Sequence, residues 1–492
     1  MFTPSEFREL YQPSICPKRV WLRERRPGLA RDDSEFLELI QRRGRELEER
    51  HLSILGTYQR PTYATGNLDE GAIATEALIS AGAPVIYQGV LKSSDGRFGA
   101  IPDFLILDAD VRRYRIREAK LATNLADHPE IGDQMGLYKL IAEERWGYSP
   151  ILEVVKGDGS LESPFEAPDT ATVTDNISKI ASLRELVSEP EEPVGWSKCN
   201  ECPFRSHCWD RAVAEKDIAV VPHLEQGMWR AVRNVGVSSY EELSRMTTSK
   251  LSPVSFPRGR GVQPIGDPRA EKILRQARVL STGRTEAISP LVFPDGYSPR
   301  QRPVVMFDIE NDIYDAELGV KVYLWGLLVV TGQGPSEPSL IVAGRGRNGD
   351  EQGWQGFLRA AQDIFRIHGG IPFIHYAAHE KTWVGKYVER YGDSDGIAAR
   401  VLENLWDMQR AVTKSLVLPI YSYSLKHVET LTEFERSQEE YGGLWSLVTY
   451  DKYLNAGYPE EAEVIMGTIK TYNREDLLAS LATYEWLERM AG

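Results

Sequence analysis

The sequence has few cysteines and lacks the long apolar runs of a membrane protein. Its 492 residues include four cysteines, and no run of about 18 apolar residues could cross a bilayer. The first residues, MFTPSEFRELYQPSICPKRV, carry charges where a secretory signal needs an apolar block. We therefore expect a cytoplasmic protein without membrane contacts. In that compartment, clustered cysteines bind metal more often than they form disulfides.

An excess of positive charge is also lacking. The chain has 58 Lys and Arg against 72 Asp and Glu, which gives a net charge of −14. This disfavours a protein that coats nucleic acid through a broad basic surface. It leaves open an enzyme that approaches nucleic acid through divalent cations held by carboxylates. A P-loop of the form G-x4-GK[ST] is absent from the sequence, so the chain does not encode an ATP-driven motor.

The length predicts two or three domains. Short β-type runs fill residues 84–120, and a second α/β unit begins near residue 302 with the apolar strand VVMFDIE. Between these units, the segment SPVSFPRGRGVQPIGDP is rich in Pro, Gly and Arg and is the best candidate linker. We predict an α/β protein with an N-terminal domain, a small helical connector and a C-terminal domain, at residues 1–215, 216–295 and 296–492.

Two neighbouring predicted strands, IPDFLILD and RYRIREAK, carry acidic residues and a lysine. Residues two apart on a strand share a face, so Glu118 and Lys120 point the same way and Asp103 can lie opposite them. Carboxylates that converge beside an ammonium group can hold Mg²⁺ or Mn²⁺ and a water molecule whose pKa the metal lowers. An ordinary salt bridge at a strand end is the alternative.

The surrounding residues resemble the RecB-type PD-(D/E)XK nucleases over roughly residues 1–215. That family has a histidine on an upstream helix, then D and E-x-K on strands, then Q-x3-Y on a helix. The corresponding residues here are His51, Asp103, Glu118, Lys120, Gln134 and Tyr138. The resemblance implies a restriction-endonuclease-like fold in which the D, E and K residues are catalytic. It also implies that the histidine and both carboxylates bind a divalent ion, and that the glutamine and tyrosine contact substrate. A solvated helix residue is the alternative for His51.

The cysteines form one early position and a C-x2-C-x5-C trio: Cys16, Cys199, Cys202 and Cys208. Iron–sulfur members of the same family, including the AddB-type nucleases and the CRISPR-associated RecB-like exonucleases, have this arrangement around the nuclease core. The resemblance implies a [4Fe-4S] cluster that closes a long loop and stabilises the domain. Zinc on the same four thiolates is the alternative, followed by unrelated buried cysteines and by disulfides.

The last third of the chain carries a second acidic set. Asp308 and Glu310, in VVMFDIEN, share one face of an apolar strand, where two buried carboxylates are costly without a cation. Glu380 lies at another strand end, and Tyr472 and Asp476 stand at i and i+4 of a predicted helix. Four carboxylates can hold two divalent ions about 3.5–4 Å apart, and the tyrosine can position the attacking water.

This set resembles the DEDDy 3′–5′ exonucleases of the RNase H-like fold, especially the YprB-like branch, over about residues 300–492. The resemblance implies that all five of these residues are catalytic, and that Asp308, Glu310 and Asp476 bind divalent metal. Glu380 departs from the family pattern, which has aspartate there, unless Asp407 fills the place. Lys426 in SYSLK is expected to contact substrate phosphate, with a solvated lysine as the alternative.

Together the two resemblances predict a metal-dependent nuclease with two separate centres. It would act on DNA ends or single strands, in DNA repair or in defence against foreign DNA, and a helicase is a candidate partner. One alternative is an RNA-processing 3′–5′ exonuclease in which the C-terminal centre dominates. The other is a catalytically degenerate scaffold that only binds nucleic acid.

Overall fold

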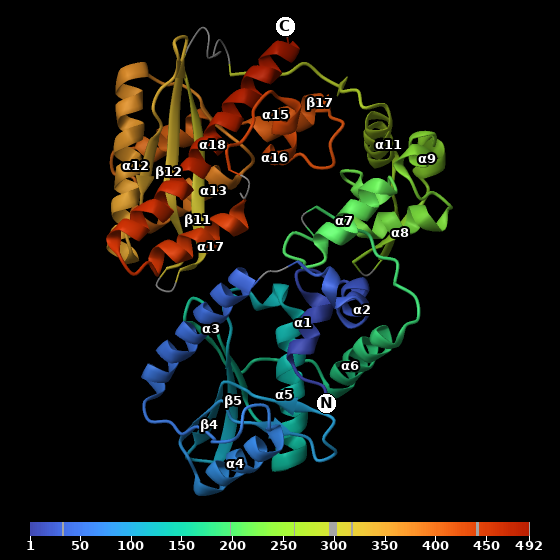
Figure 1. The fold of residues 1–492 in the computed structure, drawn as a ribbon, viewed down its shortest axis with the longest axis vertical. Coiled ribbons are helices and arrows are strands. Elements are labelled where there is room, and N and C mark those ends of the chain that lie inside the picture. The colour runs from blue at the N-terminus through green and yellow to red at the C-terminus, as the bar shows by residue number, and fades with distance from the viewer. Residues whose placement is uncertain are drawn as a thin grey trace. The chain divides into compact units, whose positions relative to one another are not determined.

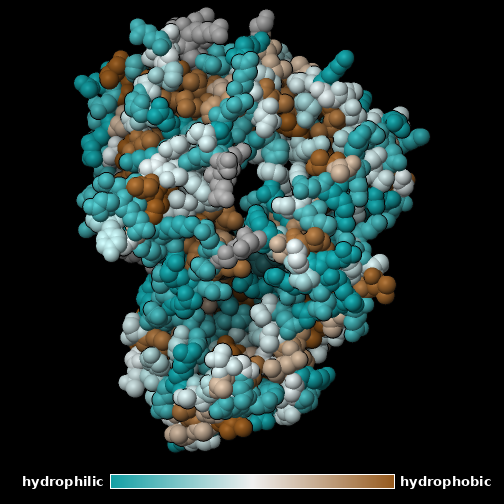
Figure 2. All heavy atoms as spheres, viewed as in Figure 1, coloured by the Kyte–Doolittle hydropathy of each residue, from teal (hydrophilic) through white to brown (hydrophobic). Residues whose placement is uncertain are grey.

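The computed structural model describes residues 1–31, 34–196, 198–259, 261–294, 303–315, 318–438 and 442–491. The chain divides into two compact units, Met1–Trp209 and Asp210–Gly492. The boundary expected between residues 295 and 296 lies outside the described residues. Among the helices that the structure describes, none is long and apolar enough to cross a membrane. Figure 2 shows a face of mostly hydrophilic side chains, on which hydrophobic ones gather only in small groups.

The first unit is built on a mixed sheet of five strands in the order β1-β4-β5-β6-β7. The strands are β1 (Val85–Tyr87), β2 (Leu91–Lys92), β3 (Gly99–Ala100), β4 (Phe104–Asp108), β5 (Arg113–Ala119), β6 (Leu152–Val155) and β7 (Leu161–Glu162). The helices are α1 (Ser5–Tyr11), α2 (Pro17–Arg25), η1 (Pro27–Leu29), α3 (Ser34–Leu55), α4 (Leu68–Ala81), η2 (Leu125–Asp127), α5 (Pro129–Trp146), α6 (Thr170–Glu185) and α7 (Arg205–Ala214), which continues into the second unit.

The antiparallel pair of β4 and β5 positions the N-terminal acidic residues. Phe104 lies opposite Arg117, so Asp103 lies next to Glu118 at the end of this ladder. Helix α5 begins at Pro129, where a fixed φ suits the first helical turn, and ends at Gly147, whose φ of 71° closes the helix. It packs against α1 and α6 and contributes Met135, Leu137 and Ile141 to the core.

The second unit contains a six-stranded sheet in the order β13-β12-β11-β15-β16, with β14 also paired to β12 (Figure 1). These strands are β11 (Val304–Asp315), β12 (Gly319–Thr331), β13 (Gly334–Pro335), β14 (Ser339–Val342), β15 (Phe373–His375) and β16 (Leu405–Asp407). The helices after β14 are α12 (Gly346–His368), α13 (His379–Tyr391), α14 (Ile397–Asn404), α15 (Met408–Ser415), α16 (Leu425–Val428), η4 (Glu429–Leu431), α17 (Gly443–Leu454) and α18 (Pro459–Ala491), and β17 (Leu416–Val417) follows α15.

The side chains of β11 alternate between two cores. Val305 and Phe307 face the core formed with α12, α13 and α14, whereas Val304 and Met306 face the core that contains α15 and α18. Because alternate residues of a strand share a face, Asp308 and Glu310 project to the α18 side. The apolar pattern that predicted this strand therefore also determines which helix meets its two carboxylates.

The connector belongs to the second unit and is more ordered than the sequence suggests. Its elements are η3 (Ile218–Val220), α8 (Gln226–Asn234), α9 (Tyr240–Ser244), α10 (Thr248–Leu251), β8 (Ser255–Arg258), β9 (Gly261–Pro264), α11 (Asp267–Thr282) and β10 (Glu286–Ala287), which pairs with β17. The prediction of a linker at residues 252–268 is wrong, because β8 and β9 form a hairpin there. Phe256 is 1% exposed and Ile265 is 3% exposed, so the hairpin is anchored by burial of its apolar side chains.

Candidate active sites

The structure brings three predicted acidic residues of the second unit together. Strand β11 supplies Asp308 and Glu310, and α18 supplies Asp476. One carboxylate oxygen from each residue lies within 4.8 Å of the others. Glu310 and Asp476 are each only 7% exposed. Two buried carboxylates and the half-buried Asp308 therefore occupy one small volume.

Mutual repulsion in this cluster is visible in the pKa values. Burial, followed by the charges of Asp476, Glu310 and Glu380, raises the pKa of Asp308 well above its usual range. Burial and the charge of Asp476 raise the pKa of Glu310 to about 8. Like charges held this close require bound protons or a bound cation at neutral pH.

Neutral side chains hold the carboxylates in place. Asn473 Nδ2 donates a hydrogen bond of 2.6 Å to Asp308 Oδ2, and Ser446 Oγ donates one of 2.9 Å to Glu310 Oε2. Gly326 lies directly opposite Asp308 in β12, and a Cβ atom at this glycine would come within 2.0 Å of Asn473 Oδ1. This contact was not predicted from the sequence. The available signals were a glycine inside the apolar run YLWGLLVV and an asparagine one turn before Asp476.

Two cations reach the same region from the segment before α17. Arg436 Nη2 lies 2.5 Å from Asp476 Oδ1, and the same guanidinium binds both carboxylate oxygens of Glu429 at 2.8 Å. Lys426 Nζ donates a hydrogen bond of 3.4 Å to the hydroxyl of Tyr472. Lys426 was predicted from its position in SYSLK, whereas no local pattern singles out Arg436. Both cations reduce the negative charge of the cluster.

Tyr472 is 4% exposed, and burial together with the charge of Asp476 raises the pKa of its hydroxyl well above the usual value. It therefore remains a hydrogen-bond donor. Glu380 lies in the first turn of α13 and is 3% exposed. Its Oε2 lies 3.2 Å from His375 Nδ1, and its charge acts on Asp308. Asp407 instead caps α15, where its Oδ1 accepts a hydrogen bond of 2.9 Å from the Arg410 backbone N–H.

In the first unit the structure brings Asp103, Glu118 and Lys120 together. Lys120 Nζ lies 2.9 Å from Glu118 Oε1, and Asp103 Oδ2 accepts a hydrogen bond of 2.8 Å from the Ala119 backbone N–H. Burial and the charge of Glu118 raise the pKa of Asp103 well above its usual range. Burial lowers the pKa of Lys120, but the two carboxylates raise it by more, so the amine stays charged.

The predicted substrate-binding pair on α5 contacts this site directly. Gln134 Nε2 donates hydrogen bonds to Glu118 Oε1, at 2.6 Å, and to the hydroxyl of Tyr138. Tyr138 is buried, and burial together with the charge of Glu118 raises the pKa of its hydroxyl well above the usual value. Both side chains therefore support the carboxylate in this structure.

Among the described residues, His51, Asp103 and Glu118 do not bring their ligand atoms within 4.8 Å of one another. His51 Nε2 is 2.9 Å from Arg117 Nη1, and Arg117 faces away from Glu118 because neighbouring residues on β5 point to opposite sides. Helix α3 instead brings Glu48 toward Asp103, whose pKa the charge of Glu48 helps to raise. The sequence analysis missed Glu48, although it stands three residues before His51 on the same helix.

The four cysteines line one small cavity of the first unit. Lys18, Arg19, Leu22, Phe204 and Arg205 also line it. The chain segments that carry the cysteines meet where Ser14 Oγ donates a hydrogen bond of 3.1 Å to the Lys198 carbonyl. The neighbouring cations favour the thiolate form of the cysteines, and four thiolates can bind one metal ion or cluster.

Comparison with known proteins identifies the C-terminal part of the chain. Residues 305–488 match the family model of the RNase H superfamily. This range contains the acidic cluster from Asp308 to Asp476. No curated protein and no solved structure matches the chain. The second unit therefore contains an RNase H-like domain, which indicates a nuclease whose substrate is nucleic acid.

Proposed function

We propose that the protein is a metal-dependent nuclease with two separate centres that hydrolyse phosphodiester bonds of single-stranded DNA or DNA ends. The convergence of Asp308, Glu310 and Asp476 within 4.8 Å, inside the range that matches the RNase H superfamily, is the observation that carries the proposal. The second unit would remove nucleotides from a 3′ end, and the first unit would be a PD-(D/E)XK centre.

The donor atoms of the C-terminal cluster suit Mg²⁺ or Mn²⁺. All three ligand atoms are carboxylate oxygens, the hard donors that these ions prefer. The raised pKa of Asp308, caused by burial and neighbouring carboxylates, supports binding of a positive charge at this cluster. When bound, the ions would lower the pKa of the attacking water and offset charge on the phosphate.

Several side chains of the second unit would prepare this centre for substrate. Asn473 fixes the orientation of Asp308, and Arg436 joins Asp476 to Glu429. The protonated hydroxyl of Tyr472 can orient a water molecule, and Lys426, bonded to that hydroxyl, can offset charge on a phosphate oxygen. Glu380, whose charge already acts on Asp308, would complete the set of four carboxylates.

The N-terminal centre has the donors for a divalent ion at Asp103 and Glu118, with Glu48 close enough to affect Asp103. Lys120 keeps its charge beside these carboxylates and can stabilise negative charge that develops on the phosphate. Gln134 orients Glu118 through its hydrogen bond of 2.6 Å. The pairing of acidic groups with a charged lysine supports the PD-(D/E)XK assignment.

The four-cysteine cavity would hold a [4Fe-4S] cluster through Cys16, Cys199, Cys202 and Cys208. Zinc on the same four thiolates is the alternative. A brown protein that loses iron in the Cys199→Ser variant would agree, whereas a colourless protein that contains zinc would exclude it.

The test of the function uses matched single-stranded DNA and RNA with the Asp103→Ala and Asp308→Ala variants, each with and without Mg²⁺. We expect DNA degradation that requires Mg²⁺. Each variant should reduce only the products of the centre that it alters. Degradation of RNA alone, lost only with Asp308→Ala, would assign the protein to RNA processing. Degradation that neither variant changes would overturn the proposal. DNA repair or defence in the cytoplasm, beside a helicase, is the setting that we propose.

A further inference from the structure

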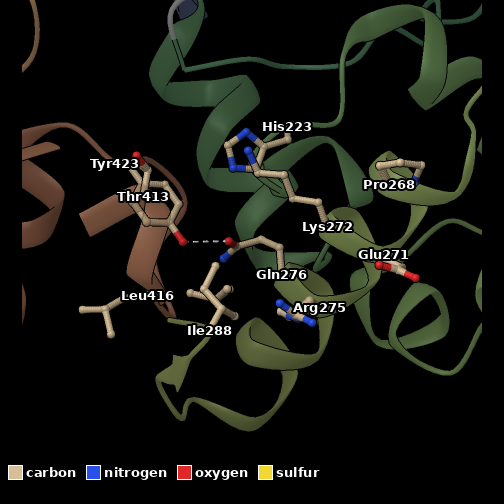
Figure 3. A pocket seen from close by; sticks show the side chains of 11 residues that line it. His223, Pro268, Glu271, Lys272, Arg275, Gln276, Ile288, Thr413, Leu416 and Tyr423 are labelled. Atoms are coloured by element: carbon tan, nitrogen blue, oxygen red, sulfur yellow. Dashed lines mark hydrogen bonds between the residues drawn. The ribbon is translucent and has the colours of Figure 1, made fainter. Parts of the chain in front are cut away.

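A second binding feature of the C-terminal unit is a pocket beside α11, which we call the α11 pocket (Figure 3). It is lined on one side by His223, Lys272, Arg275 and Gln276, and on the other by Tyr423 and Leu416. Its volume is about 150 Å³. None of these residues belongs to the acidic cluster.

The α11 pocket is basic in a chain with a net charge of −14. Lys272 and Arg275 stand three residues apart on α11 and share one helix face. Figure 3 shows the Lys272 side chain extending toward the imidazole of His223. Among the described residues that line the pocket, Glu271 alone is acidic, and Arg275 also forms an ion pair of 3.3 Å with Glu286 outside the lining. This balance favours an anionic ligand.

A flat aromatic surface forms one wall of the same pocket. The His223 ring stacks on Tyr423 at 26° with centroids 6.1 Å apart. The hydroxyl of Tyr423 donates a hydrogen bond of 2.9 Å to Gln276 Oε1 and accepts one of 3.0 Å from the Leu418 backbone N–H. Partial burial, followed by the charge of Lys272, lowers the pKa of His223, so its ring is neutral at pH 7.

The backbone of His223 adds a sign of function. Its φ is +73°, a left-handed conformation that residues other than glycine rarely adopt. Such strain persists only where the surrounding structure enforces it, and it is concentrated at functional sites. Here it keeps the imidazole over Tyr423, at the mouth of a basic pocket.

The pocket is linked to the acidic cluster through one short segment. Tyr423 stands three residues before Lys426, which contacts Tyr472. The hydroxyl of Tyr376 donates a hydrogen bond of 2.8 Å to the Tyr423 carbonyl, and Tyr376 follows His375, the neighbour of Glu380. A single nucleic-acid strand that contacts Lys426 can therefore continue toward the α11 pocket.

We propose that the α11 pocket binds one nucleotide of the single-stranded substrate, with Lys272 and Arg275 on its phosphate and the face of His223 against its base. Basic groups that follow the backbone, combined with aromatic rings that stack on bases, are the usual means of gripping single strands. The inference rests on the proposed nuclease function and deepens it, because the connector becomes part of the substrate path.

The test measures binding of a fluorescent single-stranded 12-mer to the full chain by anisotropy. The Asp308→Asn variant without divalent ions serves as the non-cleaving background. In this background we expect Lys272→Glu to weaken binding about tenfold and to reduce the salt dependence. Lys250→Glu, at an exposed lysine on α10 of the same connector, is the matched control and should change binding less than twofold.

His223→Asn separates a role of the ring from a role in folding. Asparagine tolerates a positive φ, so the melting temperature should be unchanged, whereas loss of the ring should weaken strand binding about tenfold. Equal effects of Lys272→Glu and Lys250→Glu would overturn the inference while leaving the nuclease proposal intact. The inference would also be overturned if His223→Asn weakened strand binding only because the variant unfolds.

The source of the nucleotide is tested with a nucleoside monophosphate as competitor. If the pocket holds the strand, the monophosphate should compete weakly with the 12-mer, and Lys272→Glu should reduce the affinity of both. Monophosphate binding that depends on Lys272, with strand binding unchanged, would identify a site for free product and overturn the proposal. Trimming from the 3′ end that persists in Asp308→Asn with Mg²⁺ would instead contradict the proposed function of the second unit.

Discussion

The two acidic sites of the molecule differ in how neighbouring side chains offset the negative charge of their carboxylates. In the first unit, Glu118 is paired with Lys120 at 2.9 Å and accepts a hydrogen bond from Gln134. In the second unit, three carboxylates lie within 4.8 Å, and the nearest cation, Arg436, is shared between Asp476 and Glu429. The second site therefore has more unbalanced negative charge than the first.

This difference suggests different demands for metal. The lysine of the first site neutralises one carboxylate, which leaves a small charge for a single divalent ion. The second site has Glu380 in addition to its three clustered carboxylates, a set large enough for two ions. We therefore expect the C-terminal centre to depend more steeply on metal concentration. The following predictions test this contrast.

The largest effect should come from Asp308→Asn, which removes one charge from the C-terminal cluster. We expect hydrolysis from the 3′ end to fall about a thousandfold, because metal binding contributes several kcal/mol to catalysis. End-labelled strands with blocked or free 3′ ends measure this directly. Asp103→Asn is the control and should leave 3′-end trimming unchanged. Equal losses of 3′-end hydrolysis in the two variants would show that Asp103 and Asp308 act in one centre rather than in two.

A smaller effect is expected from Lys120→Gln, which removes the cation of the first site. Cleavage by this centre should fall about a hundredfold, the usual result of losing one group that stabilises charge in the transition state. Its activity should also shift to higher Mg²⁺ concentrations, because Glu118 loses its partner at 2.9 Å. Products made by the C-terminal centre should not change. A variant that cleaves normally would remove Lys120 from the catalytic set.

The contact between Gly326 and Asn473 predicts an effect of about tenfold. A methyl group at Gly326 would come within 2.0 Å of Asn473 Oδ1 and displace the amide from Asp308. We expect Gly326→Ala and Asn473→Ala each to slow 3′-end trimming about tenfold, and the double variant to be no slower than Asn473→Ala. Gly385→Ala is the control, since no atom lies within 4 Å of its added Cβ. Additive losses would contradict this coupling.

The smallest effect concerns stability and pH. The folded-state pKa of Glu310, about 8, lies above its unfolded value near 4.3, so its stabilising proton is lost as pH rises through 8. Without metal, the stability of the second unit should fall between about pH 4.3 and 8. Mn²⁺ should raise the melting temperature by several degrees at pH 8 and by less at pH 5. Asp308→Asn should reduce the difference between the two rises in melting temperature. An equal rise at pH 8 and pH 5 in the unmodified protein would contradict the prediction.

The regular parts of both sites could be predicted from the sequence. Alternation along a strand was sufficient to place Asp308 and Glu310 on one face, and a spacing of four placed Tyr472 and Asp476 on one side of α18. The same reasoning joined Glu118 and Lys120. These arrangements depend on local periodicity, which the chain shows directly.

Features that depend on packing between distant segments could not be predicted. Helix α3 places Glu48 where its charge raises the pKa of Asp103, whereas His51, three residues later, contacts Arg117, and no local pattern places Arg436 beside Asp476. Residues 252–268 resemble a linker in composition, yet Phe256 is buried and anchors a hairpin. In each case a long-range contact determines the outcome.

The central claim is that divalent ions sit between the clustered carboxylates of the second unit. Anomalous diffraction from crystals grown with Mn²⁺ tests it most directly. The account predicts a Mn²⁺ peak in contact with Asp308, Glu310 and Asp476, and no such peak in Asp308→Asn. An empty cluster at saturating Mn²⁺, with Arg436 still bound to Asp476, would contradict it.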